Sequence, residues 1–258
     1  MPHLKSFAGL RMSTKYVRNW YSVLALYSNI LSSTTAKFKD GHNIIIHKNN
    51  FLQFYEELYV RYLKDQGFTY ETLGKNVLVK TPIGFLLKLP EPPYSFVLDE
   101  IFIMRVYGNP DLTGRVVIDI GSSIGDSSIY FTSLGATEIL SFEIDKSLCY
   151  LAEENIRLNN LSSKIHVYNE RATSEVIRKL ISQQHLENIF MKIDCEGCEV
   201  EIINNMDDNT IKCISDLVLE HHYDVKPLSN KLKSAGFKVR RKKEILFASK
   251  TENGSWIS

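Results

Sequence analysis

A short loop rich in glycine, serine and aspartate is the segment of this chain whose residue types best fit ligand binding. It spans residues 119–126 and follows the apolar, β-branched run Val116–Ile120, which predicts a buried strand. Gly121 allows a sharp turn at the end of that strand, and the small residues after it let a ligand approach the backbone. The predicted helix that follows offers free backbone N–H groups.

The charge of this loop separates two classes of ligand. A dinucleotide fingerprint would place glycines at positions 121, 123 and 126, but Ser123 and Asp126 stand at the last two. An acid there repels a pyrophosphate, whereas S-adenosylmethionine carries an ammonium, a carboxylate and a sulfonium. Asp119 or Asp126 can accept a hydrogen bond from the ammonium. The loop residues predicted to bind this cofactor are Asp119, Gly121, Ser122, Ser123, Gly125, Asp126 and Ser127.

An acid further along the chain supports the same cofactor. Glu143 lies 22 residues after Gly121, at the end of the next predicted strand. An acid about 20 residues after such a loop is placed to accept both ribose hydroxyls. Ile144 would pack on the adenine, and Glu170 or Arg171 would contact the adenine edge.

Two further groups of polar residues follow the predicted strands Ile189–Ile193 and Leu217–Glu220. The ends of these strands would border the transferred methyl group. Methyl transfer to a hydroxyl requires an aligned acceptor that loses its proton. We favour a metal-free reaction with Asp194 or His221 as the base. The candidate catalytic residues are Asp194, His221, Glu196 and Lys192, and their polar neighbours are Glu199, Glu220 and His222.

Two other interpretations of these groups stay open. By resemblance to metal-dependent catechol-type O-methyltransferases, Asp194 with Glu220 or His221 would hold a divalent cation. Alternatively, Glu196 and Glu199 would only cap the following helix at its positive end, and one histidine would only satisfy a hydrogen bond in the core.

Several separate motifs resemble the FkbM family of methyltransferases. They are VIDIGSSIGDSSIYF (117–131), SFEI (141–144), ENIRLNNL (154–161), MKIDCEGCEVEII (191–203), LEHH (219–222) and LKSAGF (232–237). This resemblance covers residues 97–240 and implies a class I methyltransferase fold with O-methylation of sugar or polyketide-type hydroxyls. The chain departs from the family pattern at Cys195 and Cys198, and at Ile144 and Lys146, where the family often has prolines.

The four cysteines, Cys149, Cys195, Cys198 and Cys213, do not predict a disulfide framework, because no convincing secretory signal precedes them. The pair Cys195-x-x-Cys198 invites a redox or zinc interpretation, but it lacks a second pair at zinc spacing. We therefore expect both side chains to be buried as small apolar residues.

From Val116 onward, predicted strands and helices alternate, which is typical of a doubly wound parallel sheet. We predict an α/β class I methyltransferase (Rossmann-like) fold with a doubly wound seven-stranded sheet and an α+β N-terminal extension. The expected strands are 116–120, 138–142, 164–168, 189–193 and 217–220, with a closing antiparallel pair at 237–240 and 245–249. The expected helices are 127–133, 146–158, 174–181 and 228–235.

The chain before this sheet predicts an N-terminal extension over residues 1–96, a possible acceptor lid on the cofactor domain of residues 97–258. Helix 12–31 would present an apolar face, which we expect to pack on the core rather than on a partner or membrane surface. That face comprises Val17, Trp20, Leu24, Tyr27 and Leu31. Next come a hairpin at 37–47, a helix at 51–65, a hairpin at 76–89, a linker turn at Glu91–Tyr94 and a short helix at 97–107.

The overall charge argues against a nucleic-acid partner, since 31 basic and 30 acidic residues leave a formal net charge of +1. Residues 1–39 are nevertheless basic and free of acids, so they could form a targeting segment. The run Trp20–Leu31 is too short and polar to span a bilayer, which needs ~20 apolar residues. We expect a cytoplasmic monomer or homodimer that methylates a small hydroxylated acceptor such as a sugar, a glycan or a lipid-linked sugar. The alternatives are an RNA methyltransferase that uses the basic N-terminal region, and a non-catalytic S-adenosylmethionine-binding module.

Overall fold

The computed structural model describes residues 7–73, 76–90 and 95–250. Its main sheet has seven strands in the order β11–β12–β10–β9–β6–β7–β8. The five strands from β10 to β8 run parallel, and β12 is antiparallel to both β10 and β11. The strands are β6 (Val116–Ile120), β7 (Glu138–Phe142), β8 (Ile165–Tyr168), β9 (Ile189–Ile193), β10 (Ile214–Glu220), β11 (Lys238–Lys242) and β12 (Ile245–Ser249). The predicted doubly wound seven-stranded sheet of a class I methyltransferase is thereby confirmed.

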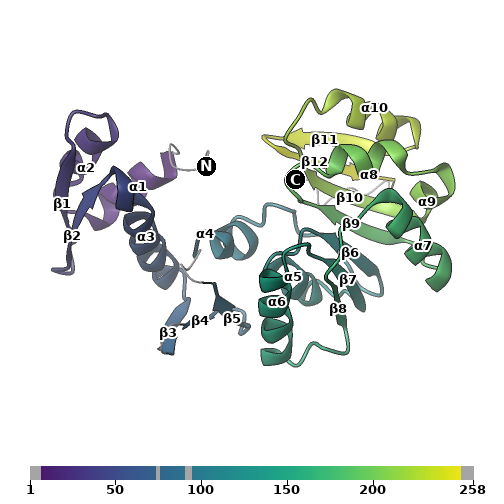
Figure 1. Ribbon diagram of the computed structural model, residues 1–258, viewed down its shortest axis with the longest axis horizontal. Helices are drawn as coiled ribbons and strands as arrows, with labels where there is room; N and C mark the ends of the chain where they lie inside the picture. The colour runs from purple at the N-terminus through teal and green to yellow at the C-terminus, as the bar shows by residue number, and fades with distance from the viewer. Residues whose placement is uncertain (1–6, 74–75, 91–94, 251–258) are drawn as a thin grey trace.

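Helices cover both faces of this sheet (Figure 1). Alternate residues of a strand point to opposite faces, so Ile118 packs in the core with α7 to α10, and Val117 packs in the core with α5 and α6. Asp145 accepts hydrogen bonds from the first turn of α6, as its position before that helix predicts. The helices are α5 (Asp126–Ser133), α6 (Lys146–Leu158), α7 (Ser174–Gln184), α8 (Glu199–Asn205), α9 (Asp208–Cys213) and α10 (Lys226–Ser234). The sequence indicated α8 only as the helix that Glu196 and Glu199 would cap, and it did not predict the short helix α9.

A small antiparallel sheet packs against α6. It contains β3 (Thr69–Leu73), β4 (Asn76–Lys80) and β5 (Leu86–Leu89), and β3 was not predicted. Asn155 of α6 and Asn159, which directly follows this helix, bind the free edge of β5 as a further strand would. Asn155 bonds both backbone groups of Lys88, and Asn159 bonds both backbone groups of Leu86. The small sheet is therefore fixed to the main sheet domain.

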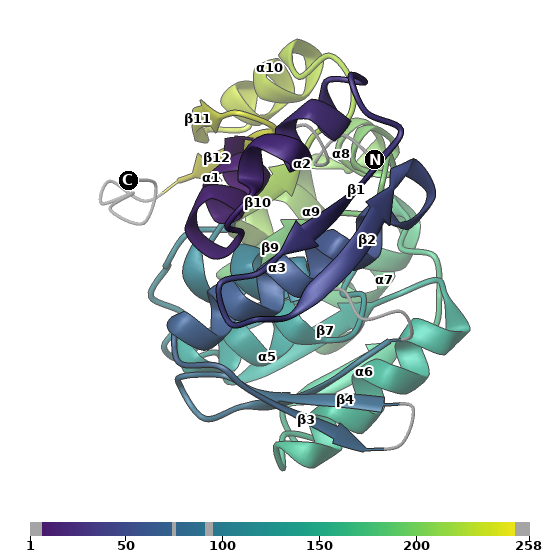
Figure 2. The same cartoon turned by 90° about the vertical axis from the view of Figure 1, so that its left-hand side faces the viewer.

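The N-terminal part forms its own layer beside the sheet domain and is joined to it through α4 (Figures 1 and 2). It has an apolar core of its own, centred on Phe38, Phe54 and Leu58. Its elements are α1 (Phe7–Tyr16), α2 (Trp20–Tyr27), β1 (Ser33–Lys37), β2 (Asn43–His47), η2 (Lys48–Asn50), α3 (Phe51–Asp65) and α4 (Ser95–Leu98). The predicted hairpin and the helix at 51–65 are confirmed, while the linker turn Glu91–Tyr94 lies outside the described residues.

The prediction of one helix over residues 12–31 is wrong. Val17 forms a β-bridge with Phe38, which separates α1 from α2. The predicted apolar face is also wrong, because Trp20 and Leu24 are exposed, and the residues of α2 that pack in the core are Val23 and Leu26. Within the described ranges, none of the helices combines the length and the apolar character that a membrane crossing requires.

The segment between α4 and β6 begins with a π-helical turn, η3 (Asp99–Ile103), where a short helix was predicted over 97–107. Here the amide of Met104 donates to the carbonyl oxygen of Asp99, five residues earlier. Single π-helical turns frequently occur at functional sites, since they change the direction in which side chains point. This turn brings Glu100 toward the ends of the central strands, as described below.

Candidate functional site

The glycine loop after β6 is locked against the end of β9. Gly121 has a φ of +76°, and a Cβ atom built on it would lie 1.7 Å from the carbonyl oxygen of Asp194. The amide of Asp194 donates to the carbonyl oxygen of Ile120 at 2.9 Å. Glycine is therefore required at position 121 for its turn, as predicted, and also for a backbone contact that fixes Asp194.

Small residues of the loop also allow close packing behind it. Gly125 has a φ of +80°, and a Cβ atom there would lie 3.2 Å from the side chain of Ala152 on α6. Ser122 is fully buried, and its hydroxyl lies 3.4 Å from the carbonyl oxygen of Phe142. These two residues shape the loop, so contact with a cofactor would involve their backbone.

A buried ion pair supports the loop from the sheet side. Lys192 donates to the carbonyl oxygen of Gly121 at 2.7 Å and lies 3.1 Å from Asp119. The hydroxyls of Ser127 and Ser128 donate to the other carboxylate oxygen of Asp119. Burial lowers the pKa of Lys192, but the charges of Asp119 and Asp194 outweigh it and hold the pKa above its ordinary value. These contacts favour a positioning role for Asp119, Ser127 and Lys192, and their direct contacts with cofactor or acceptor stay predictions.

Asp126 begins α5 at the mouth of the loop and is 5% exposed. Burial raises the pKa of its carboxyl to about 7, with a smaller contribution from Asp119, while Lys192 opposes the change. A cationic group bound beside Asp126 would stabilise the ionised form. The predicted contact with an ammonium therefore fits the charge and place of this residue.

Glu143 lies against the loop, as its spacing predicted. Its carboxylate accepts hydrogen bonds from the amide of Ser123 at 2.9 Å and from the amide of Asp145 at 2.8 Å. Ser123 has a φ of +49°, a conformation that costs energy in a residue with a side chain. Ile144, the next residue after Glu143, is 66% exposed. The contacts of Glu143 with ribose and of Ile144 with adenine stay predictions.

The end of β8 contributes an amide that sequence reasoning did not single out. Asn169 donates to the carbonyl oxygens of Glu143 at 3.1 Å and of Ile144 at 3.0 Å. Glu170 and Arg171, which follow it, are exposed. Their contact with the adenine edge stays a prediction.

Asn155 of α6 is a second residue that sequence reasoning missed. It is fully buried and donates to the carbonyl oxygen of Ile124 in the glycine loop at 2.9 Å. The same side chain binds Lys88 of the small sheet. A polar residue inside the otherwise apolar stripe of a predicted helix was the available signal, since buried amides need partners.

A second cluster lies where β9 and β10 end. Asp194, Glu220 and His222 each offer a ligand atom, and these atoms lie within 4.8 Å of one another. Tyr107 donates a hydrogen bond to Asp194, and burial raises the pKa of the Tyr107 phenol well above its ordinary value. Burial also raises the pKa of Glu220 to about 7, with a further contribution from the charge of Asp194. The structure thus brings Asp194 and Glu220 together, as the metal interpretation of the sequence requires.

The π-helical turn adds Glu100 to this acidic region. Burial raises the pKa of Glu100 to about 7, and the charges of Glu220, Asp194 and Asp126 add to the effect. No sequence pattern placed Glu100 here, because a π-helical turn has no recognisable spacing.

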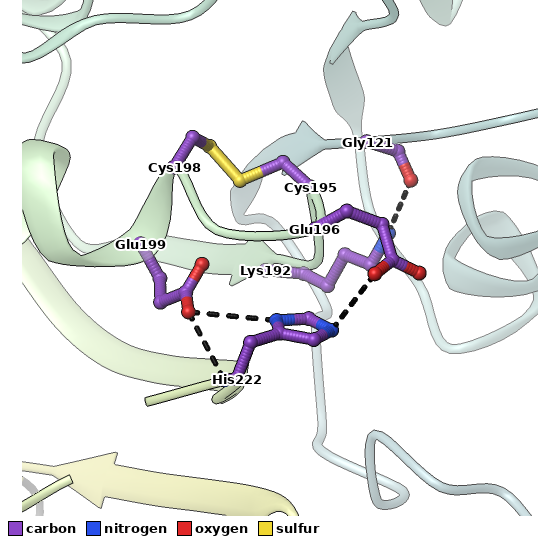
Figure 3. The surroundings of a disulfide bond; sticks show 7 residues. All are labelled: Gly121, Lys192, Cys195, Glu196, Cys198, Glu199 and His222. Atoms are coloured by element: carbon purple, nitrogen blue, oxygen red, sulfur yellow. Dashed lines mark hydrogen bonds and ion pairs between the residues drawn. A yellow bond between two sulfur atoms is a disulfide. The ribbon is translucent and has the colours of Figure 1, made fainter. Parts of the chain in front are cut away.

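The cluster contains His222 rather than the predicted His221. Figure 3 shows the His222 ring between two acids: Nδ1 lies 3.4 Å from Glu199, and Nε2 lies 3.2 Å from Glu196. Glu199 is fully buried and also accepts from the His222 amide at 3.1 Å. His221 leaves its buried Nε2 atom without a hydrogen-bond partner among the described residues. The role of His221 as a base stays a prediction that this geometry does not support.

The expectation that Cys195 and Cys198 are buried as small apolar residues is wrong. Cys195 and Cys198 form a disulfide, with their Cα atoms 5.6 Å apart (Figure 3). Positive φ angles at Glu196 and Gly197 make the tight turn that brings the sulfurs together. Cys149 and Cys213 are free. The disulfide closes the loop that carries Asp194 at one end and Glu199 at the other.

Similarity searches link the chain to known proteins over limited segments. It is 31% identical over 93 residues to uncharacterized protein 65 of a Sulfolobus islandicus filamentous virus, a match of 36% of this chain and 52% of the viral protein. It is 43% identical over 54 residues to the ribosomal protein L11 methyltransferase of Lactococcus lactis subsp. cremoris, which is 21% of this chain and 17% of that enzyme. The chain thus spans about half or less of these relatives.

Solved structures are distant matches. The S-adenosylmethionine-dependent methyltransferase from Agrobacterium tumefaciens has a TM-score of 0.47 at 15% identity, over 70% of this chain and 72% of that one. The ribosomal protein L11 methylase from Lactobacillus delbrueckii subsp. bulgaricus has a TM-score of 0.38 at 17% identity, over 52% and 67%. Likenesses of this size do not bear on mechanism or acceptor.

A family model matches more than half of the chain. The model of the ribosomal protein L11 methyltransferase (PrmA) family matches residues 102–245. This range is more than half of the 258 residues and contains the glycine loop, Glu143 and the cluster at Asp194. The chain therefore belongs to the ribosomal protein L11 methyltransferase family.

Proposed function

We propose that the chain is an S-adenosylmethionine-dependent methyltransferase that binds its cofactor over Gly121–Asp126, with the ribose at Glu143. The observation that carries this proposal is the charge around the glycine loop. Glu143, Asp126 and Asp194 surround a loop whose turn and helix N-terminus would otherwise suit a phosphate. A cofactor with a sulfonium and an ammonium complements these acids, whereas the pyrophosphate of a dinucleotide would be repelled.

The proposed reaction is transfer of the methyl group to an acceptor hydroxyl. Asp194 lies at the end of β9, is fixed by its backbone contacts with the glycine loop, and accepts a hydrogen bond from Tyr107. A carboxylate held there is placed to orient a hydroxyl and accept its proton, which is the help a neutral hydroxyl needs. The FkbM-like motifs of the sequence support a sugar, glycan or secondary-metabolite acceptor.

Family membership favours a second acceptor class. The L11 methyltransferases are named for a ribosomal protein, so a protein acceptor is the alternative that the family match supports. RNA remains a third acceptor class for testing, because residues 7–39 contain basic residues and no acid. A module that binds S-adenosylmethionine without catalysis is the remaining alternative.

We also propose that the N-terminal part helps to shape the acceptor site. Its helix α3 is anchored next to η3, because Glu56 accepts hydrogen bonds from the amide and the hydroxyl of Ser95 in α4. The chain then runs directly into Glu100 and Tyr107, which reach the Asp194 cluster. Residues 1–96 would act as the lid, although β3–β5 pack on the sheet domain.

A transfer assay with methyl-labelled S-adenosylmethionine tests the proposal. Separate reactions would contain a mixture of sugars and glycans, a ribosomal protein preparation, and tRNA. We expect label in the sugar and glycan fraction, and at least a tenfold lower rate for Asp194→Asn. Asp208→Asn, an exposed acid at the start of α9, is the matched control and should keep the wild-type rate. Label found only in the protein fraction or only in RNA would show that this class, and not sugars or glycans, contains the acceptor. Cofactor binding without transfer to any acceptor would favour the non-catalytic module.

A further inference from the structure

The cluster of Asp194, Glu220 and His222 has the donor set of a metal site. Two carboxylates and one imidazole offer ligand atoms within 4.8 Å of one another. Two atoms that each lie about 2.0–2.2 Å from one cation are at most about 4.4 Å apart, so ligand atoms at the 4.8 Å limit would move together by a few tenths of an ångström on binding. The three residues come from the ends of β9 and β10, so the sheet itself brings the ligands together.

The orientation of His222 is an independent observation that points to a metal. Glu199 is fully buried, points toward the imidazole and lies 3.4 Å from its Nδ1 atom (Figure 3). One oxygen of Glu199 contacts both the ring and the amide of His222, and the other has no hydrogen-bond partner among the described residues. A carboxylate that holds one ring nitrogen of a histidine typically fixes the tautomer that offers the other nitrogen to a metal. Here Nε2 is that nitrogen, and its partner is Glu196, which is 88% exposed.

The surrounding charge also calls for a cation. Asp194 and Glu220 each place a carboxylate oxygen within 4.8 Å of the other and of a His222 ring nitrogen. Lys192 is a nearby cation, but its ammonium is bound to Asp119 and to the carbonyl oxygen of Gly121. Acids gathered in this way are stable as a group only with protons or with a further positive charge.

The disulfide narrows the choice of metal. Cys195 and Cys198 lie in the same loop, but their sulfurs are bonded to each other and are not available as thiolate ligands. The remaining donors are carboxylate oxygens and one imidazole nitrogen. Imidazole suits first-row transition metals, and carboxylates suit harder cations such as Mn²⁺.

We propose that Asp194, Glu220 and His222 bind one first-row divalent cation, with Mn²⁺ as a suitable representative, and that Glu199 is the positioning residue for His222. The role of this cation in turnover rests on the proposed function, whereas its binding does not. A cation held by these residues would lower the pKa of an acceptor hydroxyl bound to it, and the released proton would pass to solvent water. With the cation bound, Asp194 would be a ligand and would not be the proton acceptor described under the proposed function, so this proposal replaces the metal-free form of that reaction.

Manganese binding to the full chain tests this site directly. Protein freed of metals with a chelator is titrated with MnCl₂ under non-reducing conditions, and free Mn²⁺ is measured by its electron paramagnetic resonance signal. We expect one Mn²⁺ per chain. The substitutions Asp194→Asn, Glu220→Gln and His222→Gln should each weaken binding at least tenfold, and Glu199→Gln should weaken it about 10- to 100-fold.

Glu175→Gln is the matched control, since this exposed acid of α7 pairs with Lys179 and lies outside the cluster. It should bind Mn²⁺ as the wild type does. Circular dichroism and binding of S-adenosylhomocysteine check that each variant folds. Absence of saturable Mn²⁺ binding by the wild type would overturn the proposal, as would wild-type affinity in folded Asp194→Asn or His222→Gln. Mn²⁺ binding without S-adenosylhomocysteine binding would instead overturn the proposed cofactor and leave the metal site standing.

Discussion

The sheet domain and the N-terminal part differ in where their charged side chains lie. In the N-terminal part, ion pairs such as Lys15–Asp65 lie at the surface, and the core around Phe38 and Phe54 is apolar. In the sheet domain, Asp119, Lys192 and Glu199 are at most 1% exposed. Burying charges is costly, so proteins keep them where they fix a site. The contrast locates the chemistry at the glycine loop and the ends of β9 and β10.

Two glycines with positive φ angles differ in their surroundings, and this contrast gives the largest expected effect. Gly121→Ala would place a Cβ atom 1.7 Å from the Asp194 carbonyl oxygen at a φ of +76°. We expect a loss of more than about 4 kcal/mol in the free energy of unfolding, measured by urea denaturation.

Gly84→Ala, in the turn between β4 and β5, is the control. Its φ is +98°, but no atom lies within 4 Å of the added Cβ. Only backbone strain remains, which costs about 1 to 2 kcal/mol. Equal losses at the two glycines would show that the loop is not locked against β9.

The second-largest effect separates the buried charges from the exposed ones. Lys192→Met leaves Asp119 buried without its cation, which should cost about 3 to 5 kcal/mol in urea unfolding. Lys15→Met removes a partner of Asp65 at the surface, where solvent screens the pair, and should leave the unfolding midpoint unchanged. A stable Lys192→Met variant would mean that Asp119 is neutral in the folded chain.

A third test compares two aspartates across pH. The folded chain raises the pKa of Asp126 from its ordinary 3.8 to about 7, so the protonated form stabilises the fold. This contribution is complete below pH 3.8 and is lost as the pH rises toward and through 7. The stability of Asp126→Asn relative to the wild type should therefore rise between pH 5 and pH 8.

Asp65→Asn is the reference for this experiment. The Lys15 ammonium and the Tyr16 hydroxyl lower the pKa of Asp65 below 3.8, so this acid stays ionised throughout that range. Its stability relative to the wild type should not change between pH 5 and pH 8. A pH-independent difference for Asp126→Asn as well would contradict the burial of an acid at the mouth of the loop.

The smallest effect compares Glu143, which directly follows β7, with Glu138, the first residue of that strand. Glu143→Gln removes the charge that would accept the ribose hydroxyls and should weaken S-adenosylhomocysteine binding about tenfold, since a hydrogen bond to a charged group contributes about 1.5 to 3 kcal/mol. Glu138 lies at the other end of the same strand. The variant Glu138→Gln should therefore bind S-adenosylhomocysteine as the wild type does. If Glu143→Gln bound S-adenosylhomocysteine with unchanged affinity, the ribose would bind at another place than Glu143.

The sequence allowed the sheet domain to be predicted well because buried parallel strands and short turns have strong local patterns. Val116–Ile120 is apolar throughout, and the interval from Gly121 to Glu143 corresponds to one helix and one strand. Both features depend on local geometry, so they can be found without knowledge of tertiary contacts.

The remaining features depend on contacts between distant segments. A helical pattern runs through Val17, but its pairing with Phe38 breaks the helix there. The π-helical turn that carries Glu100 has no pattern of its own. His222 rather than His221 joins the cluster because a buried acid, Glu199, holds it from another element. Tertiary contacts of this kind are not encoded in spacing.

The most direct test of the central claim is a calorimetric titration of S-adenosylhomocysteine, the demethylated cofactor, into the full chain. The charged loop at Gly121–Asp126 with Glu143 beside it predicts saturable binding of one molecule per chain. Competition with S-adenosylmethionine should displace it. Absence of saturable binding, with the chain folded by circular dichroism, would contradict the assignment of this site to S-adenosylmethionine.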